Sequence, residues 1–240
     1  MRSSDLIALT AVCVAVVLPA QAGAALPGTV AFHQIDFQDG SVQLYLARAD
    51  GSSGAVALTS PASAPDPSAC LEEAGCVAES PDWSPDGSRI FFDATWVPFV
   101  HLWSIAPDGS DPVMEPPITD FDGLPGVSQD GSVIAWDGGN EDGSAQGIYL
   151  RALGSAAATR LTNGPSDGFD SSPDISPDNT RVVFTRFHSP GVRVEIWIVN
   201  ADGTGLRRLL SSGRRWGDPH FSPDGSKILV QAYDELANQG

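Results

Sequence analysis

The stretch SPDWSPDGSRIFF, residues 80–92, places a Ser-Pro-Asp-Gly turn between two segments that have the composition of β-strands. Three close copies follow it: GVSQDGSVIAW (126–136), DISPDNTRVVF (174–184) and HFSPDGSKILV (220–230). The serines that open the four turns are 44, 48 and 46 residues apart. A period in the mid-forties is typical of a four-stranded propeller blade, so this repeat decides the fold prediction.

Each residue of Ser84-Pro85-Asp86-Gly87 suits a tight connection between antiparallel strands. The serine accepts a hydrogen bond from the turn backbone, the proline fixes φ at the second position, and the glycine can take a positive φ. The second copy has Gln129 in place of the proline, and the third has Asn179 in place of the glycine. Both replacements still allow a turn, which indicates a structural role for the motif.

Each unit contains a second repeated strand that carries an aromatic residue. Leu or Ile next to Tyr or Trp, in an alternation of period two, predicts a strand with a core aromatic residue at Tyr45, Trp103, Tyr149 and Trp197. A further short strand is expected to end at ALT (57–59), PIT (117–119), RLT (160–162) and RLL (208–210). Several such sheets can bury both of their faces by packing radially.

The prediction is therefore an all-β chain that forms a β-propeller of four-stranded antiparallel blades, with about four to five blade units. The units lie approximately at residues 28–60, 80–119, 124–162, 172–210 and 217–233. The first strand of the unit occurs four times and the second strand five times. Two arrangements fit this count. In one, the first strand of the C-terminal unit joins the N-terminal strands and closes a ring. In the other, the chain forms an open arc, as an incomplete or truncated propeller.

The pattern P-x-W-S-P-D-G-S-R-I, the I-W strand, the D-G turn and the L-T ending resemble the WD-like β-propeller repeat of the TolB family. The match covers about residues 28–233. Proteins of that family carry an α/β domain before the propeller, whereas the apolar leader of this chain runs straight into GTVAFHQ (28–34). The resemblance thus implies a TolB-like propeller without the preceding domain.

The N-terminus has the pattern of a secretory signal. Arg2 precedes an apolar stretch at residues 6–18, and AQAG (20–23) offers a cleavage site, so we predict a signal peptide at residues 1–22 and an exported propeller at 23–240. A retained anchor is the alternative. No later segment is apolar enough to be an integral membrane segment, and the predicted location is periplasmic or secreted.

The net charge of −17 argues against nucleic acid or anionic lipid as a ligand and favours basic partners or cations. In the exported chain, Cys70 and Cys76 of CLEEAGC predict a disulfide that closes a local loop. No His or second Cys pair lies near them, so no metal site is predicted there. No cofactor is predicted; calcium stays open, although no stretch has the spacing of an EF-hand.

Two places are candidates for ligand binding. Asp82, Asp174 and His220 follow the prolines of the first strands, which line the channel of a propeller, and could converge on a cation or a basic ligand; alternatively they cap turns or hydrogen-bond neighbouring blades. The second place is the face with the variable connections. We expect loops there at residues 60–80, 93–100, 137–146, 163–172, 186–192 and 211–218, and the last of them carries Arg214, Arg215 and Trp216.

The sequence predicts no enzyme. GPSDG (164–168) matches the Gly-x-Ser-x-Gly nucleophile elbow, but that elbow needs a helix after the serine, and here another propeller strand is expected, so Ser166 is not a catalytic candidate. The main hypothesis is a non-catalytic scaffold that binds a protein or peptide partner, or another ligand, in the cell envelope. The alternatives are a carbohydrate-active enzyme that uses two of Asp82, Asp170, Asp174 and Asp218, and an incomplete propeller that completes itself by self-assembly.

Overall fold

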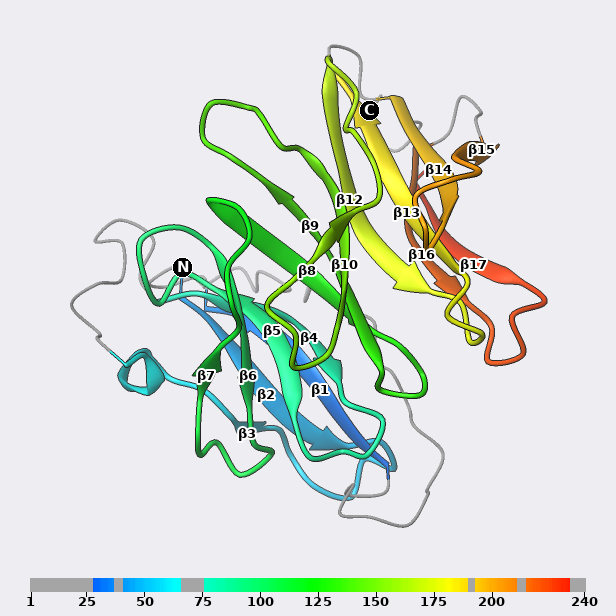
Figure 1. Ribbon diagram of the computed structural model, residues 1–240. Coiled ribbons are helices and arrows are strands. Elements are labelled where there is room, and N and C mark those ends of the chain that lie inside the picture. Colours follow the sequence, from blue (N-terminus) through cyan, green and yellow to red (C-terminus); the bar gives the residue numbers. More distant parts are fainter. Residues whose placement is uncertain (1–27, 37–40, 66–75, 190–192, 211–214, 234–240) are drawn as a thin grey trace, which may run out of the picture.

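The computed structural model describes residues 28–36, 41–65, 76–189, 193–210 and 215–233 (Figure 1). These residues form β-strands in antiparallel sheets, together with one short 3₁₀ helix at Pro61–Ser63. The all-β prediction is thus confirmed. The predicted signal peptide lies outside the described residues.

Five sheets follow one another along the chain, and we number them in that order. The first sheet contains β1 (Thr29–Ile35), β2 (Val42–Arg48) and β3 (Val56–Ala57). The second contains β4 (Ala78–Trp83), β5 (Ile90–Ala94), β6 (His101–Ile105) and β7 (Val113–Met114). The third contains β8 (Phe121–Val127), β9 (Val133–Gly139), β10 (Gly147–Ala152) and β11 (Thr159–Arg160). The fourth contains β12 (Gly168–Ile175), β13 (Arg181–His188), β14 (Arg193–Asn200) and β15 (Arg207–Leu210), and the fifth contains β16 (Arg215–Phe221) and β17 (Ile228–Tyr233).

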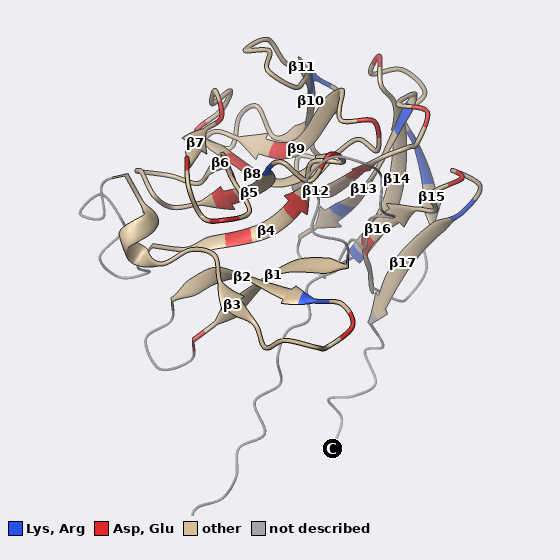
Figure 2. Cartoon of the chain, turned by 90° about the horizontal axis from the view of Figure 1, so that it is seen from below, with Lys and Arg blue, Asp and Glu red and all other residues tan. Residues whose placement is uncertain are grey.

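The first strands of the repeat lie toward the middle of the molecule. Figure 2 shows β4, β8, β12 and β16 there, with the short strands β3, β7, β11 and β15 at the periphery. Each of these inner strands contacts the next one along the chain. The predicted blade order, from an inner first strand to an outer fourth strand, is therefore present.

The described chain forms an open arc. Strand β16 pairs with β17, and β1 pairs with β2, so within the described residues β16 does not join the first sheet. Of the two predicted arrangements, the closed ring with a shared blade is therefore wrong. Its physical reason is that β17 follows β16 through the same Ser-Pro-Asp-Gly turn as in the earlier sheets, and this hairpin occupies the outer edge of β16.

The core lies between sheets, in three clusters of buried side chains. One cluster joins the first and second sheets and includes Leu44, Phe92 and Trp96. The others join the second to the third sheet and the third to the fourth. Trp103 and Tyr149 are buried as predicted, whereas Tyr45 and Trp197 are half-buried. Hydrophobic burial between radial sheets therefore holds the arc together.

The repeated turn has the predicted geometry. The amide of Gly87 donates to the carbonyl of Ser84 over 2.8 Å, and the amide of Arg89 donates to Ser84 Oγ over 2.9 Å. Asp86 does more than tolerate its position, because its Oδ1 accepts hydrogen bonds from the Ser84 hydroxyl and from the Ser88 amide. The aspartate thus replaces water as the partner of several turn donors.

Three of the four predicted fourth strands are misplaced by a few residues, whereas β15 ends at Leu210 as predicted. Strands β3, β7 and β11 end before the threonines that were expected to close them. Instead, Thr59 Oγ1 accepts from the Leu44 amide and Thr162 Oγ1 from the Ile148 amide, each over 2.9 Å. In the first and third sheets, the threonine of the Leu-Thr ending follows the short outer strand. Its side chain accepts a hydrogen bond from the strand before that one, β2 or β10.

Candidate binding site on the inner strands

Every inner strand that follows a predicted blade boundary contains a β-bulge at the same place. The register shifts between Glu79 and Asp82, and the equivalent shift recurs in β8, β12 and β16. At each bulge one residue has a positive φ of 46–52°, and a proline follows it; these residues are Ser80, Leu124, Ser172 and Asp218. A bulge redirects the neighbouring side chains, so it sets the direction of the residue after each proline.

The bulges explain why the inner strands are longer than predicted. Strand β4 begins at Ala78, β8 at Phe121, β12 at Gly168 and β16 at Arg215, each ahead of the first residue of its predicted unit. Parts of the expected loops 163–172 and 211–218 are therefore strand. The extra residue in each bulge hides the alternation of period two that marks a strand in the sequence.

Asp82 and Asp174 each reach from one inner strand to the next. Asp82 Oδ2 accepts a hydrogen bond from the Val127 amide over 2.7 Å, and Asp174 Oδ2 accepts one from the Phe221 amide over 2.6 Å. The contacts thus match the alternative in which these carboxylates hydrogen-bond neighbouring blades. The equivalent residue of the third sheet is Gly126, where an added Cβ would lie 2.7 Å from the Pro173 carbonyl oxygen.

Of the three residues that were expected to converge, Asp174 and His220 lie next to each other on adjacent inner strands. His220 Nδ1 lies 3.7 Å from Asp174 Oδ1, and this contact raises the pKa of His220 against the opposing effect of burial. Burial raises the pKa of Asp82 to about 6, and the negative charge of Asp174 adds to that effect. The three side chains therefore act on one another across three sheets.

Two further carboxyls belong to this region and were not singled out from the sequence. Burial and the charge of Glu79 raise the pKa of Asp93 well above its usual range, and burial raises the pKa of Asp137 to about 7. Both carboxyls lie within 4 Å of the point that a Cβ on Gly123 would occupy. We call Glu79, Asp82, Asp93, Asp137 and Asp174 the inner acidic cluster; Figure 2 shows acidic stretches on β4, β5, β9 and β12 in the middle of the arc.

A signal for Asp93 and Asp137 was present in the sequence. They are 44 residues apart, which is the step between the first two turns, and each follows an apolar second strand. The sequence prediction assigned them to the loops 93–100 and 137–146, whereas Asp93 lies within β5 and Asp137 within β9. Strand two is thus longer than its apolar run, since β5 continues through Asp93 to Ala94 and β9 continues through Asp137 to Gly139.

The structure describes the backbone of two of the three residues predicted for ligand binding on the variable face. Arg214 lies outside the described residues, and so does Cys70, so the Cys70–Cys76 disulfide stays a prediction; Cys76 itself is buried. Arg215 and Trp216 begin β16, opposite Tyr233 and Ala232. They were expected in the loop 211–218, but they belong to the longer inner strand, and their role in ligand binding stays a prediction.

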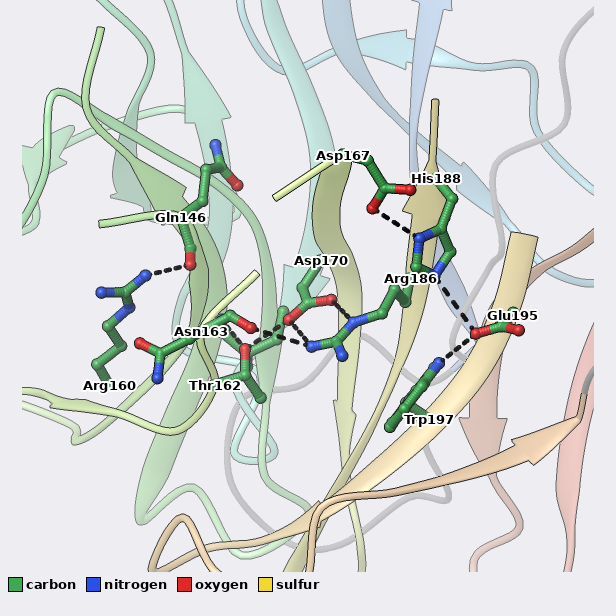
Figure 3. A network of polar contacts seen from close by, with 11 residues as sticks. Gln146, Arg160, Thr162, Asn163, Asp167, Asp170, Arg186, His188, Glu195 and Trp197 are labelled. Atoms are coloured by element: carbon green, nitrogen blue, oxygen red, sulfur yellow. Dashed lines mark hydrogen bonds and ion pairs between the residues drawn. The ribbon is translucent and has the colours of Figure 1, made fainter. Parts of the chain in front are cut away.

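A second polar network lies between the third and fourth sheets (Figure 3). Arg186 Nε lies 2.6 Å from Asp170 Oδ1, and a second guanidinium nitrogen lies 2.7 Å from Oδ2. Thr162 Oγ1 also donates to Asp170 Oδ2 over 2.6 Å, and both charged side chains are buried. Asp170 is therefore fully engaged as a structural ion pair and offers no free carboxylate for hydrolysis.

The surroundings of Ser166 lack the arrangement of a nucleophile elbow. Gly168 is the first residue of β12, so a strand follows the serine. His188 directs Nδ1 to Asp167 over 2.9 Å and Nε2 toward Glu195 over 3.4 Å (Figure 3). Both ring nitrogens thus face carboxylates. Among the described residues, no group of three or more His, Cys, Asp or Glu side chains is arranged to hold a metal ion.

Comparison with known proteins supports the fold. No protein-family model matches the chain. An uncharacterized protein from Agrobacterium fabrum is 27% identical, over 65% of this chain and 66% of its own length. TolB from Acinetobacter baumannii superposes with a TM-score of 0.67 at 18% identity, over 88% of this chain and 48% of that one. The TolB-type protein of Agrobacterium tumefaciens gives 0.63 at 23% identity, over 85% and 66% of the two chains.

The fold is shared with enzymes as well. An oligogalacturonate lyase in complex with manganese superposes with a TM-score of 0.57 at 17% identity, over 88% of this chain and 57% of the lyase. The chain spans about two thirds or less of these proteins. Within the described residues, no helix has the length and hydrophobicity to span a membrane. The comparisons thus establish a TolB-like β-propeller fold and leave its activity to the site.

Proposed function

We propose that the chain is a non-catalytic binding scaffold of the cell envelope or the secreted fraction, and that it binds a basic segment of a protein or peptide partner at the inner acidic cluster. The observation that carries this proposal is the placement of Asp82, Asp174 and His220 on the inner strands, where His220 Nδ1 lies 3.7 Å from Asp174 Oδ1 across two adjacent strands. Carboxyls that are kept partly protonated by burial gain interaction energy when a cation arrives. The net charge of −17 attracts a basic partner from a distance.

The variable face supplies apolar surface near the ends of the same inner strands. Phe121 begins β8 and meets Phe99 edge to face at 5.2 Å, and Phe169 in β12 stacks on Phe187 at 4.7 Å between ring centroids. Phe121 and Phe169 are exposed, and Phe99 has a φ of 76°, which is strained for an aromatic residue. Exposed aromatic pairs are common in protein-binding surfaces, which supports a partner docked from this face, together with Arg214, Arg215 and Trp216.

Several observations support a role without catalysis. A strand, β12, follows Ser166 where a nucleophile elbow needs a helix. Asp170 is held by Arg186, so one of the four carboxylates considered for a carbohydrate-active enzyme is occupied by an ion pair. That alternative is accordingly not favoured. The pattern of residues 1–22 supports export.

Binding of a lysine-rich peptide, measured by isothermal titration calorimetry, tests the proposal. We expect the double variant D82N/D174N to bind roughly tenfold more weakly, and wild-type binding to weaken with added salt. Binding should also weaken from pH 7.5 to pH 5, because protonation of Asp82 competes with the ligand. The matched control is D108N, which removes a fully exposed carboxylate from the opposite face.

Equal binding by the wild type and D82N/D174N would overturn the proposed site. A D108N variant that is weakened as much as D82N/D174N would also overturn it, because it would show a non-specific charge effect. No detectable binding of basic peptides at low salt would overturn the ligand class. A thermal midpoint for each variant shows that the protein remains folded.

A further inference from the structure

Neighbouring sheets meet through a junction with two different halves. Between the second and third sheets, Phe91 and Leu102 lie in one buried cluster with Trp136 and Tyr149. Trp136 and Tyr149 are register partners on adjacent strands, and their rings stack with centroids 5.7 Å apart and planes inclined by 20°. The earlier sheet thus contributes the Phe91 position, and the later sheet contributes a stacked aromatic pair.

The first sheet presents an aromatic pair of the same kind. Phe32 and Tyr45 are register partners, and their rings stack at 5.9 Å and 24°. Ala31 and Leu44 belong to the core shared with the second sheet. Since successive residues of a strand point to opposite faces, Phe32 and Tyr45 lie on the face turned away from the second sheet. We call this the leading face; both of its aromatic residues are half-buried.

The fifth sheet presents the other half of the junction. Leu229 pairs with His220, as Phe91 pairs with Asp82, Ala135 with Gly126 and Val183 with Asp174. Leu229 is 71% exposed, whereas the three equivalent side chains are 5%, 0% and 0% exposed. We call the Leu229 side of β17 the trailing face. Its exposure is anomalous because the same position is buried wherever a following sheet is present.

We propose that two copies of this chain associate head to tail, with the trailing face of one copy packed on the leading face of the other. No other described sheet covers either face. The two faces reproduce the two halves of an internal junction, so their apolar surfaces are complementary in kind. The contact is heterologous, since each copy uses a different surface. The residues that carry it, Phe32, Tyr45 and Leu229, are uncharged, and the net charge of −17 on each copy opposes association.

Sedimentation equilibrium of the purified chain, from about 1 µM to about 1 mM, tests this association. We expect the mass to rise to at least that of a dimer, and to do so at lower protein concentration in high salt, because salt screens the repulsion. L229D and F32D should each reduce association at least tenfold. V56D is the matched control, because Val56 is 66% exposed on the peripheral strand β3 and should not affect it.

Mixing the two variants separates this proposal from a symmetric contact. L229D keeps an intact leading face, and F32D keeps an intact trailing face, so an equimolar mixture should recover a dimer that neither variant forms alone. A mixture that stays monomeric, a wild type that stays monomeric at every concentration and salt, or a V56D as impaired as L229D would overturn the proposal. Near-UV circular dichroism confirms that each variant is folded, and F32S replaces F32D if that variant does not fold.

Discussion

Asp178 lies in the turn between β12 and β13, and Asp137 lies on β9 between two sheets. Hydrogen bonds from Ser176 and Thr180 lower the pKa of Asp178 to about 2, whereas burial raises the pKa of Asp137 to about 7. An aspartate is therefore stabilised as an anion in the turn, at Asp178, and destabilised as an anion between the sheets, at Asp137.

This contrast extends to the two regions as a whole. The other turn aspartates, Asp86, Asp130 and Asp224, also have lowered pKa values because turn hydroxyls and amides donate to them. Asp82 and Asp93 of the inner acidic cluster have raised pKa values, chiefly because of burial. The repeated motif thus stabilises hairpins. The carboxyls whose pKa is raised by burial lie instead on the strands that the motif connects.

The largest effect should follow from breaking the ion pair in the centre of the arc. R186M leaves the fully buried Asp170 without its partner, and an uncompensated buried carboxylate costs about 3–5 kcal/mol. Urea unfolding measures this loss. A loss below about 1 kcal/mol would contradict the role of the pair, and D170N/R186M, which removes the charge as well, should be more stable than R186M.

The next effect is the pH dependence of stability. The folded-state pKa values of Asp82 and Asp137 are raised to about 6 and about 7, so their contribution to stability is present below about pH 4 and is lost as the pH rises through these values. The pKa of Asp93 is raised as well, and this carboxyl acts in the same sense. The turn aspartates act in the opposite sense, and only as the pH falls from about 4 toward 2. From pH 5 to pH 8 His220, whose pKa is also raised, acts in the same sense as the inner carboxyls, and His33, whose pKa is lowered by burial, acts in the opposite sense.

We expect the free energy of unfolding to be higher at pH 5 than at pH 8, and D137N to reduce that difference by on the order of 1–2 kcal/mol. Urea unfolding at the two pH values measures it, with D178N as the matched variant from the turn region. A wild type that is more stable at pH 8, or a D137N with an unchanged difference, would contradict the assignment.

The sequence was sufficient to predict the blades and insufficient to predict the bulges. The turn repeats every 44–48 residues, and the aromatic strand repeats with it, because each is a local device with its own residue preferences. The bulges depend on how neighbouring inner strands meet, which appears in the sequence only as a proline at a constant position. Asp82, Asp174 and His220 were found through that proline, while Asp93 and Asp137 were assigned to loops.

A smaller effect is expected in the turn itself. D178A removes the acceptor of the Ser176 and Thr180 hydroxyls and of the Thr180 amide, so it should lower stability by roughly 1 kcal/mol. The equivalent D224A should behave similarly, since its contacts are the same in kind. Thermal unfolding of both variants checks this; a twofold disagreement between them would mean that the turns are not equivalent.

The smallest effect concerns Asn179, which replaces the glycine of the repeated turn in its third copy. Its side chain donates to Asp130 Oδ2 over 2.8 Å and to Ser132 Oγ over 3.0 Å, so it joins the third turn to the second, which has Gln129 in place of proline. N179G restores the commoner turn residue at a φ of 57° but removes this link. We expect a loss of about 0.5 kcal/mol, measured by thermal unfolding; a gain in stability would show that the link contributes nothing.

The contrast between the two regions is tested most directly by NMR titration of the aspartate carboxyl carbons. We predict pKa values of about 6 for Asp82 and about 7 for Asp137, against about 2 for Asp178 and Asp224. Values near the ordinary 3.8 for all four would contradict the account, because the inner strands would then hold no carboxyl that differs from those in the turns.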